Sequence, residues 1–400
     1  MELVLLLALF VPVAVLVAST LLLISGAAKS YKEYQVYFFP FFFIFLIPCL
    51  APALPGIDLR SVIAVVPLAG IAVAVREVLI GELDLPFMAL AFLSTGGLAF
   101  WLTKRTQDTL SNEKLISGAD LDAADLSGGA ALFPRHVIRW YLGLWVVFFV
   151  VSLWWGEELG IRGQVLVNMV VLFFGGSLIM IRRYGLNARE AFALRAPHPS
   201  AWLAVLIGAP SALVFGVTVI QLVSSYLFPV PEQLLESFGQ SLVGPDLPLW
   251  QIVVLLTVMP GIFEELFFRG VLVQGLKGRI RNPWLLALAV GLIFGFYHPS
   301  LFRIIPTAWL GFLLTGVVLL SGSIYPAMLW HGLNNAIAIV PFSQGWVPED
   351  FEPETWWAIP AAVGLGLAFW ILKEGRKKAP PGGHRPTQGP GGVSAETHGP

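Results

Sequence analysis

Long apolar runs follow one another along almost the whole chain, and about eleven of them are long enough to cross roughly 30 Å of hydrocarbon as helices. They lie at residues 3–26, 36–55, 86–103, 138–156, 164–181, 201–227, 250–275, 284–298, 306–321, 324–342 and 356–372. Only 12% of the 400 residues are charged, whereas an ordinary soluble domain has about 25%. These features predict an all-α polytopic membrane protein.

The remaining composition excludes several other classes of protein. The formal net charge is −1 and no basic patch stands outside the loops, so we expect no nucleic-acid partner. The single cysteine, Cys49, lies in an apolar run, which excludes a disulfide framework and a cysteine-based zinc site. Glu2 is the one charge before Lys29, so the first apolar run lacks the basic start of a cleavable signal peptide.

The distribution of Lys and Arg predicts how the spans are oriented, because cytoplasmic loops carry an excess of both. They gather at residues 29–32, 104–139, 182–195, 277–281 and 373–378. Alternating spans through these marks give an external N-terminus and a cytoplasmic C-terminus in the cell inner (cytoplasmic) membrane. Arg303 falls on an external turn and is the exception, and the pattern assigns it no role.

Two polar stretches divide the chain. Residues 105–137 are polar, acidic in the middle and contain Ser-Gly-Gly at 127–129, which predicts a cytoplasmic linker. Residues 374–400 are rich in Pro and Gly and predict a disordered cytoplasmic tail. The piece 59–80 is interrupted by Pro, Gly and charged residues and is predicted to be re-entrant or interfacial.

Two adjacent carboxylates and an arginine lie inside the apolar run 250–275. A charge at that depth costs about 2.5–3.5 kcal/mol on insertion scales, so such residues usually face the protein interior and have a function. Glu265 and Arg269 are four residues apart and can pair along one helix face. Glu264 lies about 100° round the helix from Glu265. The spacing predicts that Glu265 is braced and that Glu264 is free to point elsewhere.

Two histidines and an asparagine complete a buried polar set. Measured along helices from the cytoplasmic side, Glu264, His298 and His331 lie about 20, 22 and 12 Å deep, so they can meet in one layer. Asn335 shares the helix face of His331. A carboxylate and an imidazole suit the activation of a water molecule, and a second imidazole with an amide can donate hydrogen bonds to an oxyanion. The pattern favours hydrolysis of an amide by water.

Three motifs carry a resemblance to a known family: Glu264-Glu265-x-x-x-Arg269, Phe294-x-x-x-His298 and His331-x-x-x-Asn335. In this order they resemble the type II CAAX prenyl endopeptidases and their bacterial relatives, the CPBP or Abi-type membrane proteases. The resemblance implies an eight-helix intramembrane protease bundle over residues 138–373. It also implies three roles: water activation by Glu264 and His298, oxyanion stabilisation by His331 and Asn335, and orientation of Glu264 by Glu265 and Arg269.

The first part of the chain, residues 1–104, resembles a different family. Residues 30–35, the piece 66–82 and the span that closes at 104–105 resemble the C-terminal membrane half of type-2 ABC exporter permeases of the sodium-extrusion kind. Gly70 stands where the resemblance leads us to expect Asn. The chain has no G-x-x-x-x-G-K-[ST] phosphate loop, so an ABC ATPase or permease subunit would have to be a separate partner.

Three hypotheses follow for function. The leading one is a membrane endopeptidase that acts on a peptide or protein substrate without a cofactor. The alternative is a transport-associated protein in which the carboxylates and histidines form a proton or ion site. A third is a zinc protease with Glu264, His298 and His331 as ligands, which would need all three donors within about 2.0–2.2 Å of one ion. Water activation tolerates wider spacing.

Overall fold

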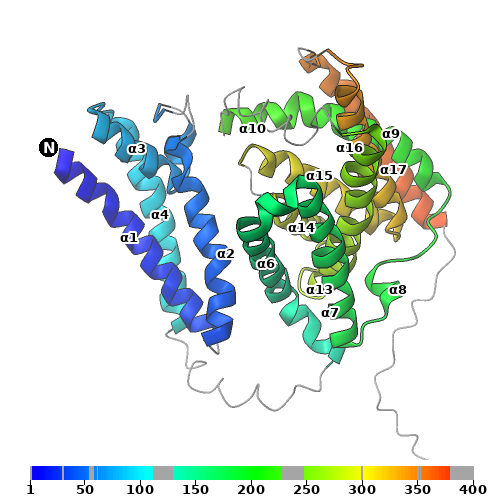
Figure 1. Ribbon diagram of the computed structural model, residues 1–400, viewed down its shortest axis with the longest axis horizontal. Coiled ribbons are helices and arrows are strands. Elements are labelled where there is room, and N and C mark those ends of the chain that lie inside the picture. Colours follow the sequence, from blue (N-terminus) through cyan, green and yellow to red (C-terminus); the bar gives the residue numbers. More distant parts are fainter. Residues whose placement is uncertain are drawn as a thin grey trace, which may run out of the picture.

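The computed structural model describes residues 2–28, 31–53, 58–60, 62–110, 129–227, 247–298, 301–348, 351 and 353–378, and within them every regular element is a helix (Figure 1). The first part contains α1 (Glu2–Ala27), α2 (Tyr31–Cys49), η1 (Ala51–Ala53), η2 (Val62–Val65), α3 (Ala69–Ile80) and α4 (Leu85–Leu110). The second part contains α6 (Gly129–Leu166), η3 (Val167–Gly175), α7 (Gly176–Tyr184), α8 (Ala188–Ala191), α9 (Ser200–Phe215), η4 (Gly216–Ile220), α10 (Gln221–Leu227), α12 (Leu249–Ile252), η5 (Val253–Val258), η6 (Pro260–Glu264), η7 (Leu266–Leu272), α13 (Val273–Leu276), α14 (Pro283–Tyr297), α15 (Leu301–Ser321), α16 (Tyr325–Ser343), η8 (Thr355–Trp357) and α17 (Ala358–Lys378).

The helices confirm an all-α multi-pass membrane protein. Among the described residues, 8 helical stretches are long and apolar enough to cross a membrane. They are Glu2–Ala27, Leu85–Asp108, Gly129–Ser152, Arg162–Tyr184, Ser200–Val223, Leu249–Leu276, Arg303–Ser321 and Thr355–Lys378. The other three predicted spans also form helices, namely α2, α14 and α16. With 15 residues, α14 is about 22 Å long, which is less than the hydrocarbon thickness.

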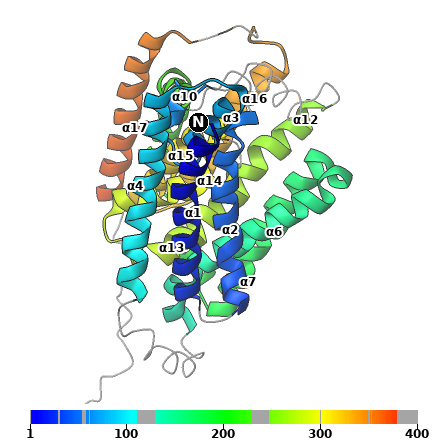
Figure 2. The same ribbon diagram turned by 90° about the vertical axis from the view of Figure 1, so that its left-hand side faces the viewer.

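The first part of the chain is a group of helices with its own core. Figures 1 and 2 show α1, α2 and α4 running roughly parallel, with the short α3 at one end. The 12 residues of α3 are too few to cross the hydrocarbon. Its Glu77 is 5% exposed and accepts a hydrogen bond of 2.7 Å from the backbone N–H of Leu59. A carboxylate is therefore buried in this part of the chain as well.

Gly70, where the ABC-permease resemblance led us to expect Asn, lies in a close backbone contact. A Cβ atom at Gly70 would come within 2.8 Å of the carbonyl oxygens of Ile63 and Ala64 in η2. A larger side chain would have to displace that backbone. The packing of η2 on α3 thus gives a physical reason for the glycine.

The two parts meet along α2 and α6. Their contact includes an ion pair of 2.7 Å between Arg139 Nη1 and Glu33 Oε1. Within the stretch 105–137, α4 continues to Leu110 and α6 begins at Gly129, so helices occupy both ends of the predicted linker. Its centre, 111–128, and most of the predicted tail, 379–400, lie outside the described residues.

Close backbone packing sets the positions of α14 and α15. A Cβ atom at Gly291 would come within 2.7 Å of Ala308 O, and one at Gly295 within 2.6 Å of Ile304 O. Small residues four apart let membrane helices approach in this way. The end of α14, with His298, is therefore held against the beginning of α15.

The charged helix predicted over residues 250–275 departs from regular α geometry. Its segments η5, η6 and η7 are π-helical, as are η3 and η4 elsewhere. Such turns leave irregular hydrogen bonding within a helix and are frequent at functional sites. Glu264 ends η6 and Glu265 separates it from η7.

Candidate active site

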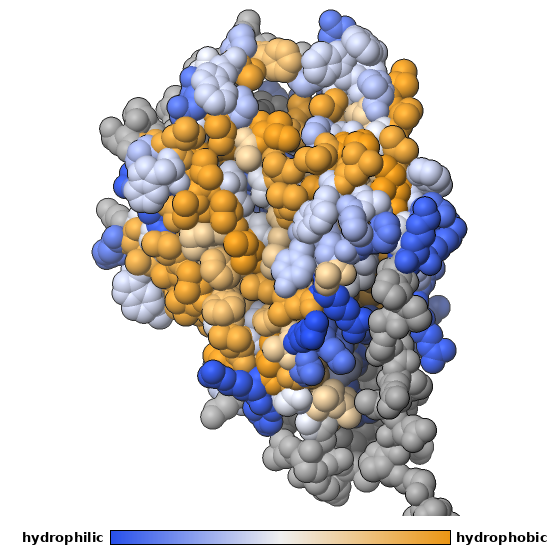
Figure 3. Space-filling model, turned by 90° about the vertical axis from the view of Figure 1, so that its right-hand side faces the viewer, coloured by the Kyte–Doolittle hydropathy of each residue, from blue (hydrophilic) through white to orange (hydrophobic). Residues whose placement is uncertain are grey.

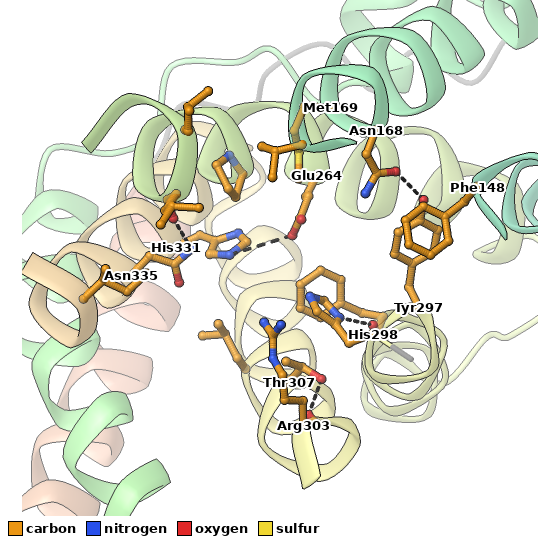
Figure 4. Close-up of a pocket in the computed structure, with 17 residues that line it drawn as sticks. Phe148, Asn168, Met169, Glu264, Tyr297, His298, Arg303, Thr307, His331 and Asn335 are labelled. Atoms are coloured by element: carbon orange, nitrogen blue, oxygen red, sulfur yellow. Dashed lines mark hydrogen bonds and ion pairs between the residues drawn. The ribbon is translucent and has the colours of Figure 1, made fainter. Parts of the chain in front are cut away.

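A cavity of about 270 Å³ opens between η3, η5, η6, α14, α15 and α16 (Figure 4). Its polar lining residues are Asn168, Glu264, Tyr297, His298, Arg303, Thr307, His331 and Asn335. Four of the six predicted site residues thus face one cavity. The other two, Glu265 and Arg269, lie behind its wall.

Glu264 reaches the cavity from η6 and lies opposite His331 of α16. Its side chain is buried, with 6% exposed, and its Oε2 lies 3.9 Å from His331 Nε2. The two helices come this close because Gly261 has no side chain. A Cβ atom there would lie 3.0 Å from Met328 O and 3.1 Å from Gly332 N.

Glu265 holds His331 directly. Its Oε1 accepts a hydrogen bond of 2.9 Å from Arg269 Nη1 and lies 2.9 Å from His331 Nδ1. Arg269 Nη2 also donates to Gly311 O of α15 at 3.1 Å. All three side chains are at most 3% exposed. The predicted pairing of Glu265 with Arg269 is present, and Glu265 contacts His331, whose other ring nitrogen lies 3.9 Å from Glu264.

The hydrogen bond from His331 to Glu265 decides what the other ring nitrogen can do. An ionised carboxylate only accepts hydrogen bonds, so Nδ1 of His331 carries a proton. In the neutral ring Nε2 is then an acceptor, and it becomes a donor in the imidazolium form. His331 can therefore donate into the cavity from Nε2 only when the ring is charged.

His298 presents a free ring nitrogen to the same cavity. It follows the last residue of α14 with extended backbone (φ −91°, ψ 100°). Its Nδ1 lies 3.0 Å from Phe294 O, and because a carbonyl only accepts, Nδ1 carries the proton. In the neutral ring Nε2 keeps its lone pair and can accept a proton from a water molecule.

Asn335 lines the cavity one helical turn from His331. Its Nδ2 donates to Leu256 O at 3.0 Å, which ties α16 to η5. The amide is thereby fixed, and its second N–H is not used in that bond. The predicted neighbourhood of His331 and Asn335 on one helix face is present.

Arg303 is the residue that the sequence analysis misplaced. The charge pattern treated it as an exception on an external turn, but it lies in α15 and lines the cavity. It is close enough to Glu264 for the two charges to interact. Figure 4 shows Arg303 on the same side of the cavity as His298, across from Glu264. The sequence offered one signal that Arg303 lies near the site, namely its position five residues after His298.

The cavity wall is fixed by a second polar contact away from the carboxylates. Tyr297 donates a hydrogen bond of 2.5 Å to Asn168 Oδ1, which joins α14 to η3. Both residues line the cavity (Figure 4). Sequence reasoning did not single them out, because they are 129 residues apart.

The zinc hypothesis gains no support from the arrangement of side chains. Within the part of the chain that the structure describes, no group of three or more His, Cys, Asp or Glu side chains is arranged to hold a metal ion. Nδ1 of His331 is already used by Glu265. Water activation does not need such a cluster.

Comparison with known families bears on the same segment. Residues 246–337 match the family model described as Type II CAAX prenyl endopeptidase Rce1-like. The matched segment contains all six predicted site residues and Arg303, and it does not extend to the ABC-permease-like part, for which no family match confirms the resemblance. Searches of curated proteins and of solved structures found no match. Over residues 246–337 this multi-pass membrane chain is therefore similar to the Rce1-like type II CAAX prenyl endopeptidases, a family whose description implies CAAX-type intramembrane protease activity.

Proposed function

We propose that the chain is an intramembrane endopeptidase of the cytoplasmic membrane in which Glu264 and His298 activate a water molecule. The observation that carries the proposal is that a carboxylate and an imidazole lone pair face one cavity from two different helices. A water molecule between them can lose its proton to either group. Among the residues that the structure describes, no Ser or Cys lines the cavity, and this mechanism needs none.

The proposed reaction has two steps, addition of water to the peptide carbonyl and cleavage of the C–N bond. The activated water adds its oxygen to the carbonyl carbon of the peptide bond, and its proton passes to Glu264 or His298. The tetrahedral intermediate carries its negative charge on the former carbonyl oxygen. When the C–N bond breaks, the proton moves to the leaving nitrogen, which gives a carboxylic acid and an amine; the acid then loses its proton to the amine, so the final products are a carboxylate and an ammonium ion.

The oxyanion is stabilised by His331 and Asn335. His331 Nε2 must donate for this role, so the imidazolium form is the active one. Glu265 orients the ring for this role, because its carboxylate accepts the hydrogen bond of Nδ1 at 2.9 Å. Arg269 in turn keeps the carboxylate of Glu265 in place at 2.9 Å. Glu265 and Arg269 are therefore positioning residues.

The decisive experiment compares membranes that contain the wild type with membranes that contain Glu264→Gln. The variant keeps the size of the side chain but removes the base. New protein N-termini, identified by amine labelling and mass spectrometry, should arise with the wild type and be missing with Glu264→Gln. Glu77→Gln is the matched control, since it removes a buried carboxylate from the first part of the chain and should leave the cleavages intact.

The same experiment also identifies the substrate. Cleavage near the C-termini of membrane-associated proteins would support processing of the CAAX type. If both variants and the wild type give the same N-termini, Glu264 is not the base and the proposal fails.

We further propose that residues 1–104 do not catalyse proteolysis and serve as a docking or substrate-presenting module. The cavity is lined by residues of α6 and later helices. A separate ABC ATPase or permease subunit is the partner that the resemblance of this part suggests. The test is a chain shortened to residues 129–400, which should still cleave a minimal peptide substrate. A folded but inactive product would show that the first part belongs to the catalytic unit.

A further inference from the structure

A second cavity, of about 160 Å³, lies at the end of the bundle that the charge pattern predicts to be cytoplasmic. Its walls come from the α8 loop, η7, α13, the end of α15 and the end of α17. It shares no lining residue with the candidate active site. Figure 3 looks onto the side where α9 and α17 lie, and hydrophilic residues gather there below an apolar band.

The charges around this second cavity are mainly positive. Four cations line it, namely Arg195, Arg269, Lys277 and Arg376, against one carboxylate, Glu190. The side chains of Arg195 and Lys277 are exposed and make no hydrogen bond or ion pair with another described residue. Their charges are thus available to a ligand.

Arg269 lines the inner part of the same cavity. It is 1% exposed, and its two terminal nitrogens donate to Glu265 and Gly311. Its Nε is buried and has no hydrogen-bond partner among the described residues. A buried donor without a partner costs about 1–3 kcal/mol, so an acceptor in the cavity would be stabilised there.

The walls of the cavity are held in place by the fold. The backbone N–H of Ile324, at the start of α16, donates to Ala193 O of the α8 loop at 3.2 Å. Arg376 donates from Nη1 to Leu319 O, which fixes the end of α17 on the end of α15. The site is therefore formed before any ligand binds.

Two ordinary explanations account for part of this charge. Cations after helix ends complement the helix dipole, and cations in cytoplasmic loops set membrane orientation. Neither explains why the buried guanidinium of Arg269, whose Nε–H has no partner among the described residues, lines the same cavity as three exposed cations. The space is equal to about five water molecules at roughly 30 Å³ each, which suits a group the size of phosphate.

We propose that this second cavity binds a phosphate-bearing anion. Arg195, Lys277 and Arg376 would surround the phosphate, and Arg269 Nε–H would meet it at the inner end. Basic pockets between helices on the cytoplasmic side of membrane proteins bind anionic lipid head groups, and a soluble phosphate offers the same chemistry. The site does not depend on the proposed proteolysis, although Arg269 connects it to Glu265.

The test uses the purified full chain in detergent with two probes. Inorganic phosphate is titrated against chloride at equal ionic strength, and the shift in melting temperature is measured. Retention of phosphatidylglycerol or of phosphatidylcholine is measured by native mass spectrometry. The test variant is Arg195→Gln/Lys277→Gln, and the matched control is Arg279→Gln/Arg281→Gln, which removes two exposed cations of the 277–281 loop that do not line the cavity.

The wild type should bind phosphate or retain phosphatidylglycerol. The affinity should be at least tenfold lower in the test variant and unchanged in the control variant. A response to phosphate alone identifies a soluble ligand, and selective retention of phosphatidylglycerol identifies a lipid head group. Absence of both responses overturns the proposal. So does an equal loss in the two double variants, because it would reflect general attraction to loop charge.

Discussion

Removing the charge of Glu265 should destabilise the fold far more than removing a charge from the surface. Glu265 and Arg269 are 0% and 1% exposed, and their side chains lie 2.9 Å apart. Glu265→Gln leaves the guanidinium buried without its counter-charge. Breaking a buried ion pair from one side costs about 3–5 kcal/mol. We expect the free energy of unfolding to fall by about that amount.

The paired variant separates loss of the pair from loss of one partner. Arg269→Met alone leaves the carboxylate uncompensated and should cost a similar amount. Glu265→Gln/Arg269→Met removes both charges, and replacing a buried pair as a whole is often close to neutral. The double variant should therefore be more stable than either single variant. This non-additive result is the signature of a directly coupled pair.

The assay is reversible denaturant unfolding in detergent, followed by tryptophan fluorescence. Lys377→Gln is the control, because it breaks an exposed pair of 2.6 Å with Glu374 and should leave the unfolding curve unchanged. If each single variant costs less than about 1 kcal/mol, the typical value of a surface pair, the reasoning is refuted. Strictly additive losses would refute it equally.

Three further predictions concern activity and topology. Asn335→Ala should lower kcat by about 10²–10³, the usual cost of losing one oxyanion donor. This loss should be smaller than the loss caused by Glu264→Gln. An unchanged rate with normal substrate binding would show that Asn335 does not stabilise the oxyanion. Cleavage should continue after dialysis against a strong zinc chelator, and a loss restored by added zinc would favour the metalloprotease hypothesis. In a Cys49→Ala background, a cysteine at Gly345 should react with an impermeant thiol reagent in intact cells, whereas one at Ser117 should be protected; labelling at Ser117 would reverse the predicted orientation.

Spacing predicted the contacts within one helix and which residues of different helices share a layer, but it could not predict the individual hydrogen bonds between helices. The pair of Glu265 and Arg269 follows from a separation of four residues. The contact of Glu265 with His331 joins residues 66 apart in the sequence. It depends on how α16 packs on η6, which a single sequence does not reveal. The resemblance implied that Glu265 orients Glu264. In the structure the imidazole of His331 lies between the two carboxylates, with Nδ1 2.9 Å from Glu265 and Nε2 3.9 Å from Glu264.

Arg303 shows a different limit of sequence reasoning. A cation near the end of an apolar run is normally read as a topological mark. It is a cavity residue here because α15 begins at Leu301 and packs closely against α14. The neighbouring helix α14, with 15 residues, is shorter than a full span. Counting apolar runs therefore predicted the fold class but not which helices cross the whole membrane.

The candidate site is built as much by glycines as by its charged residues. Gly261 lets α16 approach η6, and Gly295 lets α15 approach the turn of α14 just before His298. A displacement of about 1 Å can cost about 10² in rate even when no reacting group is lost. The separation of 3.9 Å between Glu264 and His331 is thus a property of backbone packing. Close backbone packing at these glycines thus helps to hold Glu264, His298 and His331 around one cavity.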